Sequence, residues 1–531
     1  MSKKVEISVL TLLFIFTIYC TLTTGSFWDE PYEMNIGKNR LKYLFSFGAF
    51  EYLDHYKHTE FYPGFYNTLA IFVTKMFPIK YEIEIWRLLH VTFSILTIFG
   101  IYGISKTLFN KKVGKIVFLL CFLNPIFFGH MIMNSKDTIV VFAHVWSAYI
   151  FLKYLQNQKK SKRYILFAGL TVGLGMGVRF PFLVTLIPLF LFLIIDILFF
   201  KKIINHKFLL KKFILDLIIV LIIAYLIAVS CWPHVHGNIF LDPFKLLFTQ
   251  TKIVQDIGTP WILFNGNFFA TMDLPASYII INLLYKSPEF ILVCYLIFIF
   301  LILINKKKNI ADFNSSFIKI FLIFLILLFP MIYFIFLPYR VYDGLRLFLH
   351  IMPYLNIIPG LVIYYLLVNL NTMTSKLLLT TLVVLFVYYI YIFVSLTPYQ
   401  YTYLNKLNGN FSTSYNKFEN DYFAISIKEL IRKIPNNANL TNNNKKIKIS
   451  FCGAPHYHSK RELDKLRNFD YEIMDLYEED FDYVIMTNRA VADRNEDVPK
   501  NVMSCFKKIK GEDIIKVERN GLMLSTLRKK F

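Results

Sequence analysis

Charged side chains that could do chemistry stand at the ends of long apolar runs in this sequence. A carboxylate beside an acceptor hydroxyl can act as a general base, and Lys or Arg can bind a phosphate through its positive charge. Charges at a membrane edge are costly unless they are paired or used, so their collection on one face predicts an active site. The candidates are Asp29, Glu30, His130, Lys136, Asp137, Arg179, Arg340, Tyr342, Asp343 and Arg346.

Each candidate also has a simpler structural interpretation. Asp29, which is followed by Glu-Pro, is a good N-cap for a helix. Asp137 can cap the next helix while Lys136 extends toward the membrane interface. The arginines can anchor their segments at the membrane surface or pair with Asp343. Residue types alone leave both interpretations open.

We predict no metal and no other cofactor, although the sequence leaves a divalent metal open. His234 and His236 form an H-x-H pair, which is a weak metal signal without a third ligand. No Cys/His spacing typical of a metal site occurs. Cys452 and Cys505 lie in the polar C-terminal part, where a disulfide between them is one option.

The candidate residues stand in one kind of polar break between the apolar runs. In a second kind of break the charged residues are only Lys and Arg, as at Lys111-Lys112 and Lys211-Lys212. The two kinds of break alternate, and positively charged loops mark the cytoplasmic side of a membrane protein. The candidate residues therefore fall on the opposite face, with a cytoplasmic N-terminus and an extracytoplasmic C-terminus. Positive loops also account for much of the net charge of +22, so we predict no nucleic-acid partner.

The apolar runs predict a polytopic α-helical membrane protein. Of the 531 residues, 56% are hydrophobic, more than soluble domains usually have, and the runs approach the length of a membrane-spanning helix. The first run is expected to be an uncleaved helix rather than a signal peptide. We expect about eleven transmembrane helices, at 6–25, 84–108, 113–129, 138–155, 164–179, 181–200, 213–231, 288–304, 317–337, 347–368 and 376–396.

The chain is expected to form two domains. Residues 1–397 make the transmembrane domain, with long outer loops at 26–83 and 232–287. Residues 398–531 are more polar and predict a small extracytoplasmic α/β domain. Its expected elements are an amphipathic helix at 421–434, strands at 446–452 and 482–488, and a hairpin at 514–527 with Asn520-Gly521 as its turn.

Four motifs, in this order, resemble a known family. They are Asp29-Glu30; Gly129-His130 with Asn134 and Lys136-Asp137; Tyr342-Asp343-Gly344-x-Arg346; and residues 398–409 followed by Asp421-Tyr422. The chain resembles the GT-C type glycosyltransferases that use polyprenyl-phosphate sugars. It is most similar to glycosyltransferase family 39, the protein O-mannosyltransferase group, and more distantly to lipid A aminoarabinose transferase. Leu347 departs from the pattern, because the family often has His there.

The resemblance implies an inverting transfer of a sugar from a polyprenyl-phosphate donor to an acceptor hydroxyl on the extracytoplasmic face. The acceptor, whether glycan, lipid or protein, stays open. Asp29 and Glu30 are then the catalytic pair, with Asp29 as the base. The donor phosphate would bind Lys136, Arg179, Arg340 and Arg346, while His130, Asp137, Tyr342 and Asp343 would orient these groups.

Two other functions are consistent with the sequence. A transporter or flippase of lipid-linked saccharides would have charges at mid-membrane depth and repeated halves. A polymerase or ligase of such saccharides is chemically close to the transferase. The frequent use of Asn, Lys, Ile and Phe indicates an AT-rich genome, and together with the topology it predicts a bacterial inner-membrane protein.

Overall fold

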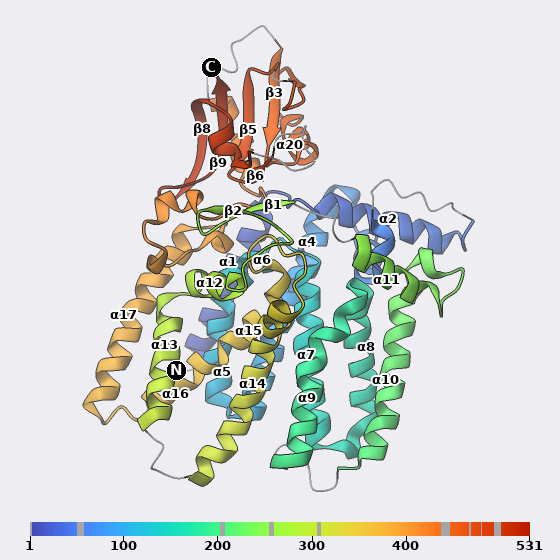
Figure 1. The fold of residues 1–531 in the computed structure, drawn as a ribbon, viewed down its shortest axis with the longest axis vertical. Helices are drawn as coiled ribbons and strands as arrows, with labels where there is room; N and C mark the ends of the chain where they lie inside the picture. Colours follow the sequence, from blue (N-terminus) through green and yellow to red (C-terminus); the bar gives the residue numbers. More distant parts are fainter. Residues whose placement is uncertain are drawn as a thin grey trace.

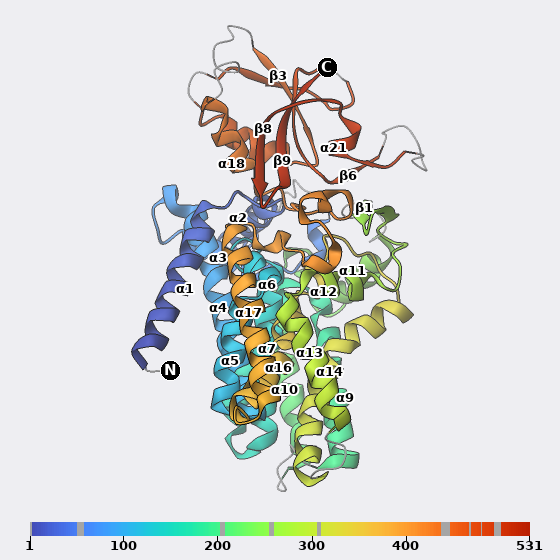
Figure 2. The ribbon, with the colours of Figure 1, turned by 90° about the vertical axis from the view of Figure 1, so that its left-hand side faces the viewer.

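The structure is a computed structural model that describes residues 3–49, 58–201, 208–253, 260–304, 310–436, 446–466, 469–478, 480–492 and 501–531. A bundle of long helices forms most of the molecule, and a small β-sheet stands on one end of it (Figures 1 and 2). The apolar runs form helices because a segment in lipid must satisfy its own backbone N–H and C=O groups.

Eight helical segments in the described part of the chain are long and apolar enough to cross a membrane. They contain α1 (Lys3–Thr23), α4 (Glu82–Leu108), α7 (Asp137–Gln156), α9 (Ile187–Ile195), α10 (Leu210–Ser230), α14 (Ile310–Phe336), α16 (Ile357–Val368) and α17 (Met373–Ser395). Two bent pairs bring the number of crossings to as many as ten. They are α5 (Lys111–Phe122) with α6 (Pro125–Met131), bent by 67°, and α12 (Tyr278–Lys286) with α13 (Glu289–Ile304), bent by 111°.

The predicted span at 164–179 forms α8 (Ser161–Val178), which packs between α7 and α10 but is not among the helices that meet the length and hydropathy requirement. The prediction of a polytopic helical membrane protein is confirmed: in the described part of the chain eight to ten segments meet this requirement, and α8 corresponds to the remaining one of the eleven predicted spans. The chain is a multi-pass membrane protein.

Charges of the two kinds lie toward opposite ends of the bundle. The first turns of α8 and α10 contain Lys162, Arg163, Lys211 and Lys212, and both helices begin at the end away from the sheet (Figure 1). The start of α7 and the helix α2 (Glu30–Phe45), which carry acidic candidates, lie at the sheet end.

Both predicted outer loops are folded. The first contains α2 and α3 (Phe65–Thr74), which pack on each other. The second contains α11 (Asp242–Ile253) and an antiparallel hairpin of β1 (Trp261–Phe264) and β2 (Asn267–Ala270).

A sheet with the strand order β4-β3-β5-β9-β8 forms the core of the C-terminal part. β3 is parallel to β4 and β5, whereas β9 is antiparallel to β5 and β8. The predicted strands and the hairpin are confirmed, and the Cys452–Cys505 disulfide, which the sequence left as one option, is present. The strand bounds are β3 (Ile447–Cys452), β4 (Tyr471–Ile473), β5 (Tyr483–Thr487), β8 (Gly511–Arg519) and β9 (Leu522–Lys530).

The helix predicted at 421–434 is shorter than expected. α18 spans only Ile427–Arg432. The Asp421 carboxylate accepts hydrogen bonds from the backbone N–H groups of Ile425 and Ser426, at 3.1 and 3.0 Å. A side chain that binds nearby backbone donors in this way favours a turn over a helix. The division of the chain at residue 397 stays a prediction.

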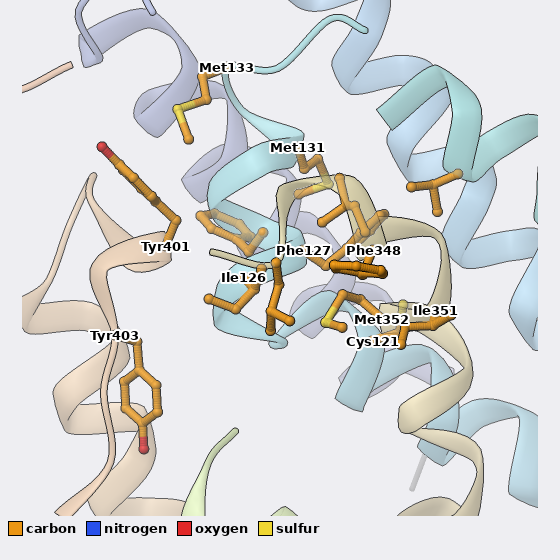
Figure 3. Packing of buried hydrophobic residues seen from close by; sticks show 14 of the residues in the cluster. Cys121, Ile126, Phe127, Met131, Met133, Phe348, Ile351, Met352, Tyr401 and Tyr403 are labelled. Atoms are coloured by element: carbon orange, nitrogen blue, oxygen red, sulfur yellow. The ribbon is translucent and has the colours of Figure 1, made fainter. Parts of the chain in front are cut away.

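An apolar layer beneath the candidate residues fixes the elements that carry them. Phe127 and Met131 of α6 pack in one cluster with Phe348 and Met352, which follow Arg346 (Figure 3). The bend before α6 arises because Asn124 Oδ1 accepts from the N–H of Phe127 at 2.9 Å and Pro125 starts a new helix. The layer therefore holds α6 and the Arg346 segment in a fixed relation.

Gly129 allows α6 to approach the segment at Tyr401. A Cβ atom at position 129 would lie 2.4 Å from Tyr401 Cβ and 2.6 Å from its backbone nitrogen. We expect Gly129→Ala to lower the free energy of unfolding by about 1–3 kcal/mol, the usual effect of overpacking. Thermal unfolding of the detergent-solubilised protein measures the effect. Gly237→Ala is the control, because the nearest atom there is 3.9 Å away, and equal stability of the two variants would contradict the packing.

Candidate functional site

The Arg346 guanidinium binds three carboxylates from separate parts of the chain. Its Nε donates to Asp137 Oδ2 at 2.8 Å, and its Nη1 donates to Asp343 Oδ2 at 3.1 Å. Its Nη2 donates to Asp29 Oδ2. The Arg346 side chain is 6% exposed, and a buried charge is stable only with well-placed partners. This group therefore joins the start of α2, the start of α7 and the turn before the 3₁₀ helix Arg346–Ile351.

Asp137 and Asp343 have both carboxylate oxygens occupied. Arg179 donates to Asp137 Oδ1, and Asn134 Nδ2 donates to Oδ2 at 2.9 Å. Arg489 Nη2 donates to Asp343 Oδ1 at 3.2 Å. The two carboxylate side chains are 5% and 3% exposed. Their position in the network suits them to orient the arginines.

Asp29 differs from the other two carboxylates. Its Oδ2 accepts from Arg346, but its Oδ1 has no hydrogen-bond partner among the described residues, and its side chain is 28% exposed. It precedes α2 without a capping hydrogen bond from its side chain. Burial raises the pKa of Asp29, but the charges of Arg346 and Lys136 outweigh burial and lower the pKa below its ordinary value. An ionised carboxylate with a free oxygen is suited to accept a proton.

The turn that carries Asp343 needs unusual backbone angles. Asp343 and Gly344 both have positive φ, at 58° and 63°, a conformation that Gly adopts freely and that Asp tolerates better than most residues. Tyr278 Oη donates to the Gly344 carbonyl at 3.1 Å. The chain therefore makes this turn before the 3₁₀ helix begins at Arg346.

Glu30 belongs to a separate ion pair. Arg87 Nε and Nη2 donate to its Oε1 and Oε2 at 2.7 and 2.8 Å. Arg87 also donates to the carbonyls of Thr24 and Gly25, both at 3.0 Å. Burial raises the pKa of Glu30, but Arg87 outweighs burial and lowers it. The pair fixes α2 on α4, so the geometry favours a positioning role for Glu30, and its catalytic role stays a prediction.

Glu33 is a buried carboxylate one helical turn after Asp29. Ser135 Oγ donates to its Oε2, whereas its Oε1 has no hydrogen-bond partner within the described ranges. Burial raises the pKa of Glu33 to about 7, although Lys136 opposes the shift. Glu33 therefore changes its charge near neutral pH, close to Asp29.

His130 contacts the ion-pair network through Asn134. Its Nδ1 lies 3.0 Å from Asn134 Nδ2, and its Nε2 lies 3.0 Å from Tyr422 Oη. Asn134 Oδ1 accepts from the N–H of Asp137 at 3.0 Å, which orients the amide so that its Nδ2 faces His130. His130 thus positions Asn134, and Asn134 positions Asp137.

Asp29, Asp137 and Asp343 form the carboxylate cluster around Arg346. A cavity of about 800 Å³ lies beside this cluster, and we call it the aromatic cavity. A smaller cavity of about 290 Å³ shares Arg179 with it and is also lined by Asp137 and Arg346. Apolar walls with a few cations suit a lipid that carries a phosphate. The polar lining of the aromatic cavity includes Tyr62, Arg179, Arg340 and Tyr342, and its apolar lining includes Phe180, Leu221, Phe244, Leu247 and Phe248.

The four predicted phosphate ligands divide into two groups. Arg179 and Arg340 line the aromatic cavity. Lys136 Nζ lies 3.4 Å from the ring centroid of Tyr62, and Arg346 is bound by carboxylates. Although Arg179 also pairs with Asp137, Arg179 and Arg340 are better placed to meet a phosphate in this cavity because they line it.

Three basic residues of the site are missing from the sequence-based candidates. Arg87 lies in an apolar run, where a charge signals a role, so it could have been found. Lys286, which is 6% exposed, has its Nζ 5.6 Å from the ring centroid of Tyr422. Lys286 ends the apolar helix α12, so it also could have been found, whereas Arg489 stands in a polar segment, where no pattern distinguishes it.

Metal ligands do not cluster in the part of the chain that the structure describes. No group of three or more His, Cys, Asp or Glu side chains there could hold a metal ion. In the predicted H-x-H pair, His236 Nε2 lies 2.9 Å from the Val229 carbonyl oxygen. His236 thus has a backbone partner.

Residues 65–232 match the family model described as dolichyl-phosphate-mannose-protein mannosyltransferase. The structure is similar to the apo oligosaccharyltransferase of Archaeoglobus fulgidus, with a TM-score of 0.50 and 11% identity over 92% of this chain and 70% of that chain. It is also similar to ArnT from Cupriavidus metallidurans bound to undecaprenyl phosphate, with a TM-score of 0.50 and 9% identity over 99% of this chain and 98% of that chain. No curated protein matches the sequence significantly.

The chain has the GT-C glycosyltransferase fold. The similarity to ArnT extends over nearly the full length of both chains, so it includes the C-terminal domain. The match to the mannosyltransferase family contains Asp137 and Arg179 but neither Asp29 nor Arg346. The roles of these last two residues therefore rest on the geometry of the site.

Glu33 and Glu30 make opposite contributions to the pH dependence of stability. The folded-state pKa of Glu33 is raised to about 7, so its stabilising contribution is present at low pH and is lost as pH rises through about 7. We expect Glu33→Gln to become more stable relative to the wild type as pH rises toward about 7, and then to level off.

Glu30→Gln is the matched control, measured by thermal unfolding in the same detergent. The folded-state pKa of Glu30 is lowered, so its contribution is present above the unfolded pKa and is lost as pH falls through the folded value. We expect this variant to be less stable than the wild type at neutral pH and closer to it in acid. The same pH trend in both variants would contradict the raised pKa of Glu33.

Proposed function

We propose that this protein transfers a sugar from a polyprenyl-phosphate sugar to an acceptor hydroxyl, with inversion at the anomeric carbon. The observation that carries the proposal is the position of Asp29. Arg346 binds its Oδ2, and its Oδ1 has no hydrogen-bond partner among the described residues. This pair lies close to a cavity with apolar walls and two arginines. The family match and the GT-C fold support the same class of reaction. ArnT was solved with undecaprenyl phosphate, a lipid of the proposed chemical class.

The proposed chemistry is one displacement at the anomeric carbon. The acceptor oxygen forms a bond to this carbon while its proton passes to Asp29 Oδ1. The bond between the anomeric carbon and the phosphate oxygen breaks, and its electron pair leaves with the polyprenyl phosphate. The low pKa of Asp29 is compatible with this role, because the acceptor hydroxyl becomes strongly acidic as its oxygen bonds to carbon.

Guanidinium groups would stabilise the departing phosphate. Arg179 and Arg340 line the cavity, and fixed cations that meet developing negative charge lower the barrier. We assign the lipid chain to the apolar wall formed by the 3₁₀ helix Phe180–Leu186, α10 and α11. We propose that the reaction needs no metal ion and therefore continues in the presence of a chelator.

The proposed location is the inner membrane of a bacterium, with the N-terminus in the cytoplasm and the C-terminal domain outside. The basic first turns of α8 and α10 support this orientation, because positive charge favours the cytoplasmic side. The site then opens to the outer leaflet and to extracytoplasmic acceptors, which are a glycan, a lipid or a protein.

We expect Asp29→Asn to lower the rate of sugar transfer by about 10²–10⁴-fold, the usual contribution of a general base. Membranes that contain the protein are incubated with a panel of radiolabelled polyprenyl-phosphate sugars, and the label transferred to any acceptor is counted. Asp242→Asn is the control, because Asp242 pairs with Lys245 on the surface of α11.

The same assay separates the enzyme from a flippase. A flippase would move the labelled lipid between the leaflets of proteoliposomes without forming a labelled acceptor. Substantial transfer by a folded Asp29→Asn variant would refute the assignment of the base.

We expect Arg179→Ala and Arg340→Ala to raise the KM for the donor, because each removes a cation from the aromatic cavity. Lys245→Ala is the control, since Lys245 lies on α11 but is 68% exposed and does not line that cavity. Initial rates at varied donor concentration give the comparison. An unchanged donor KM in both arginine variants would show that the donor phosphate does not bind in this cavity.

A further inference from the structure

Arg489 of the C-terminal domain reaches into the carboxylate cluster of the membrane domain. It follows β5 and is 7% exposed. Its Nη2 donates to Asp343 Oδ1 at 3.2 Å, and its Nη1 donates to the Tyr422 carbonyl. Its Cζ also lies 5.1 Å from the ring centroid of Trp28, the residue before Asp29. One guanidinium therefore contacts both Asp343, which pairs with Arg346, and the residue that precedes the proposed base.

The backbone at Arg489 is held from several directions. The N–H of Cys505 donates to the Arg489 carbonyl at 2.9 Å, and Cys505 is disulfide-bonded to Cys452. The amide of Asn488 donates to the carbonyl of Phe418 at 2.6 Å. A Cβ atom at Gly453 would lie 2.9 Å from Arg489 Cβ, so glycine there permits the close approach. The position of Arg489 is thus built into the C-terminal domain.

Arg489 and Arg346 share the Asp343 carboxylate. Asp343 offers one oxygen to Arg489 and the other to Arg346. Without Arg489, both oxygens of Asp343 could turn toward Arg346, since a guanidinium pairs well with a carboxylate through two parallel bonds. Asp343 would then compete with Asp29 for the Arg346 Nη groups, and the orientation of Asp29 would be lost.

We infer that Arg489 is a positioning residue through which the C-terminal domain completes the catalytic site. It occupies one oxygen of Asp343 and packs on Trp28, so that Arg346 stays available to orient Asp29. Productive transfer then requires the C-terminal domain to be docked. The inference rests on the proposed function and adds a role for this domain in the chemical step.

The test compares kcat and donor KM for Arg489→Ala, Arg489→Lys and the wild type, all as full-length protein. We expect Arg489→Ala to lower kcat by about 10- to 100-fold, the effect of misplacing a catalytic group. The donor KM stays unchanged, because Arg179 and Arg340 line the donor cavity. Arg489→Lys restores part of kcat, because it keeps the positive charge beside Asp343.

Arg519→Ala is the control for domain docking. Arg519 also joins the C-terminal sheet to the membrane domain, with its Nε donating to the Thr397 carbonyl at 2.9 Å. Arg519 makes no contact with Asp29, Asp343 or Arg346 in the described structure. We expect this variant to keep kcat near the wild-type value. Equal losses of kcat in the Arg489→Ala and Arg519→Ala variants would overturn the inference.

A double-mutant cycle with Asp343→Asn tests whether Arg489 acts through Asp343. The cycle can also be run with Arg489→Lys in place of Arg489→Ala, so it does not depend on the folding of the alanine variant. The Asp343→Asn variant has no charge at this position to be shared, so the Arg489 substitution should cost little further kcat in that background. Additive losses, which are usual for independent sites, would overturn the inference. Transfer by the wild type supports the proposed function separately, and the absence of transfer with every donor would refute that function instead.

Discussion

The site depends on the shared ion pairing of Arg346. Three carboxylates meet on one buried guanidinium, and no two of them are neighbours in the sequence. Breaking a buried pair of this kind typically costs about 3–5 kcal/mol, because a charge is left without a partner. The helices that carry Asp29 and Asp137 and the turn that carries Asp343 are therefore constrained to meet at this point.

The arrangement around Arg346 alternates in charge. Arg179 binds the outer oxygen of Asp137, and Arg489 binds the outer oxygen of Asp343. Three arginines thus balance three aspartates, and within the described structure Asp29 alone of the three keeps an oxygen without a hydrogen bond. The same network that stabilises these buried charges also leaves one carboxylate oxygen, Asp29 Oδ1, without a partner among the described residues, and this is the oxygen that we propose as the base. In the proposed mechanism, structural pairing and catalysis are two consequences of one set of contacts.

Much of the fold and part of the site could be predicted from the sequence. Asp29, Asp137 and Arg346 stand out because charges beside apolar runs are rare, and the strands of the C-terminal domain follow from alternating apolar residues and an Asn-Gly turn. The pairing of these charges could not be predicted, because it depends on which ends of the runs meet in space. Arg489 was missed because it lies in a polar segment. The raised pKa of Glu33 could not be predicted, because it comes mainly from burial.

The most direct test of the central claim is an experimental structure of the protein with a bound polyprenyl-phosphate sugar. The account predicts that the phosphate lies between Arg179 and Arg340, that Arg346 keeps its three carboxylates, and that Asp29 Oδ1 faces the anomeric carbon. A phosphate bound to Arg346, with Asp29 displaced from that guanidinium, would contradict it.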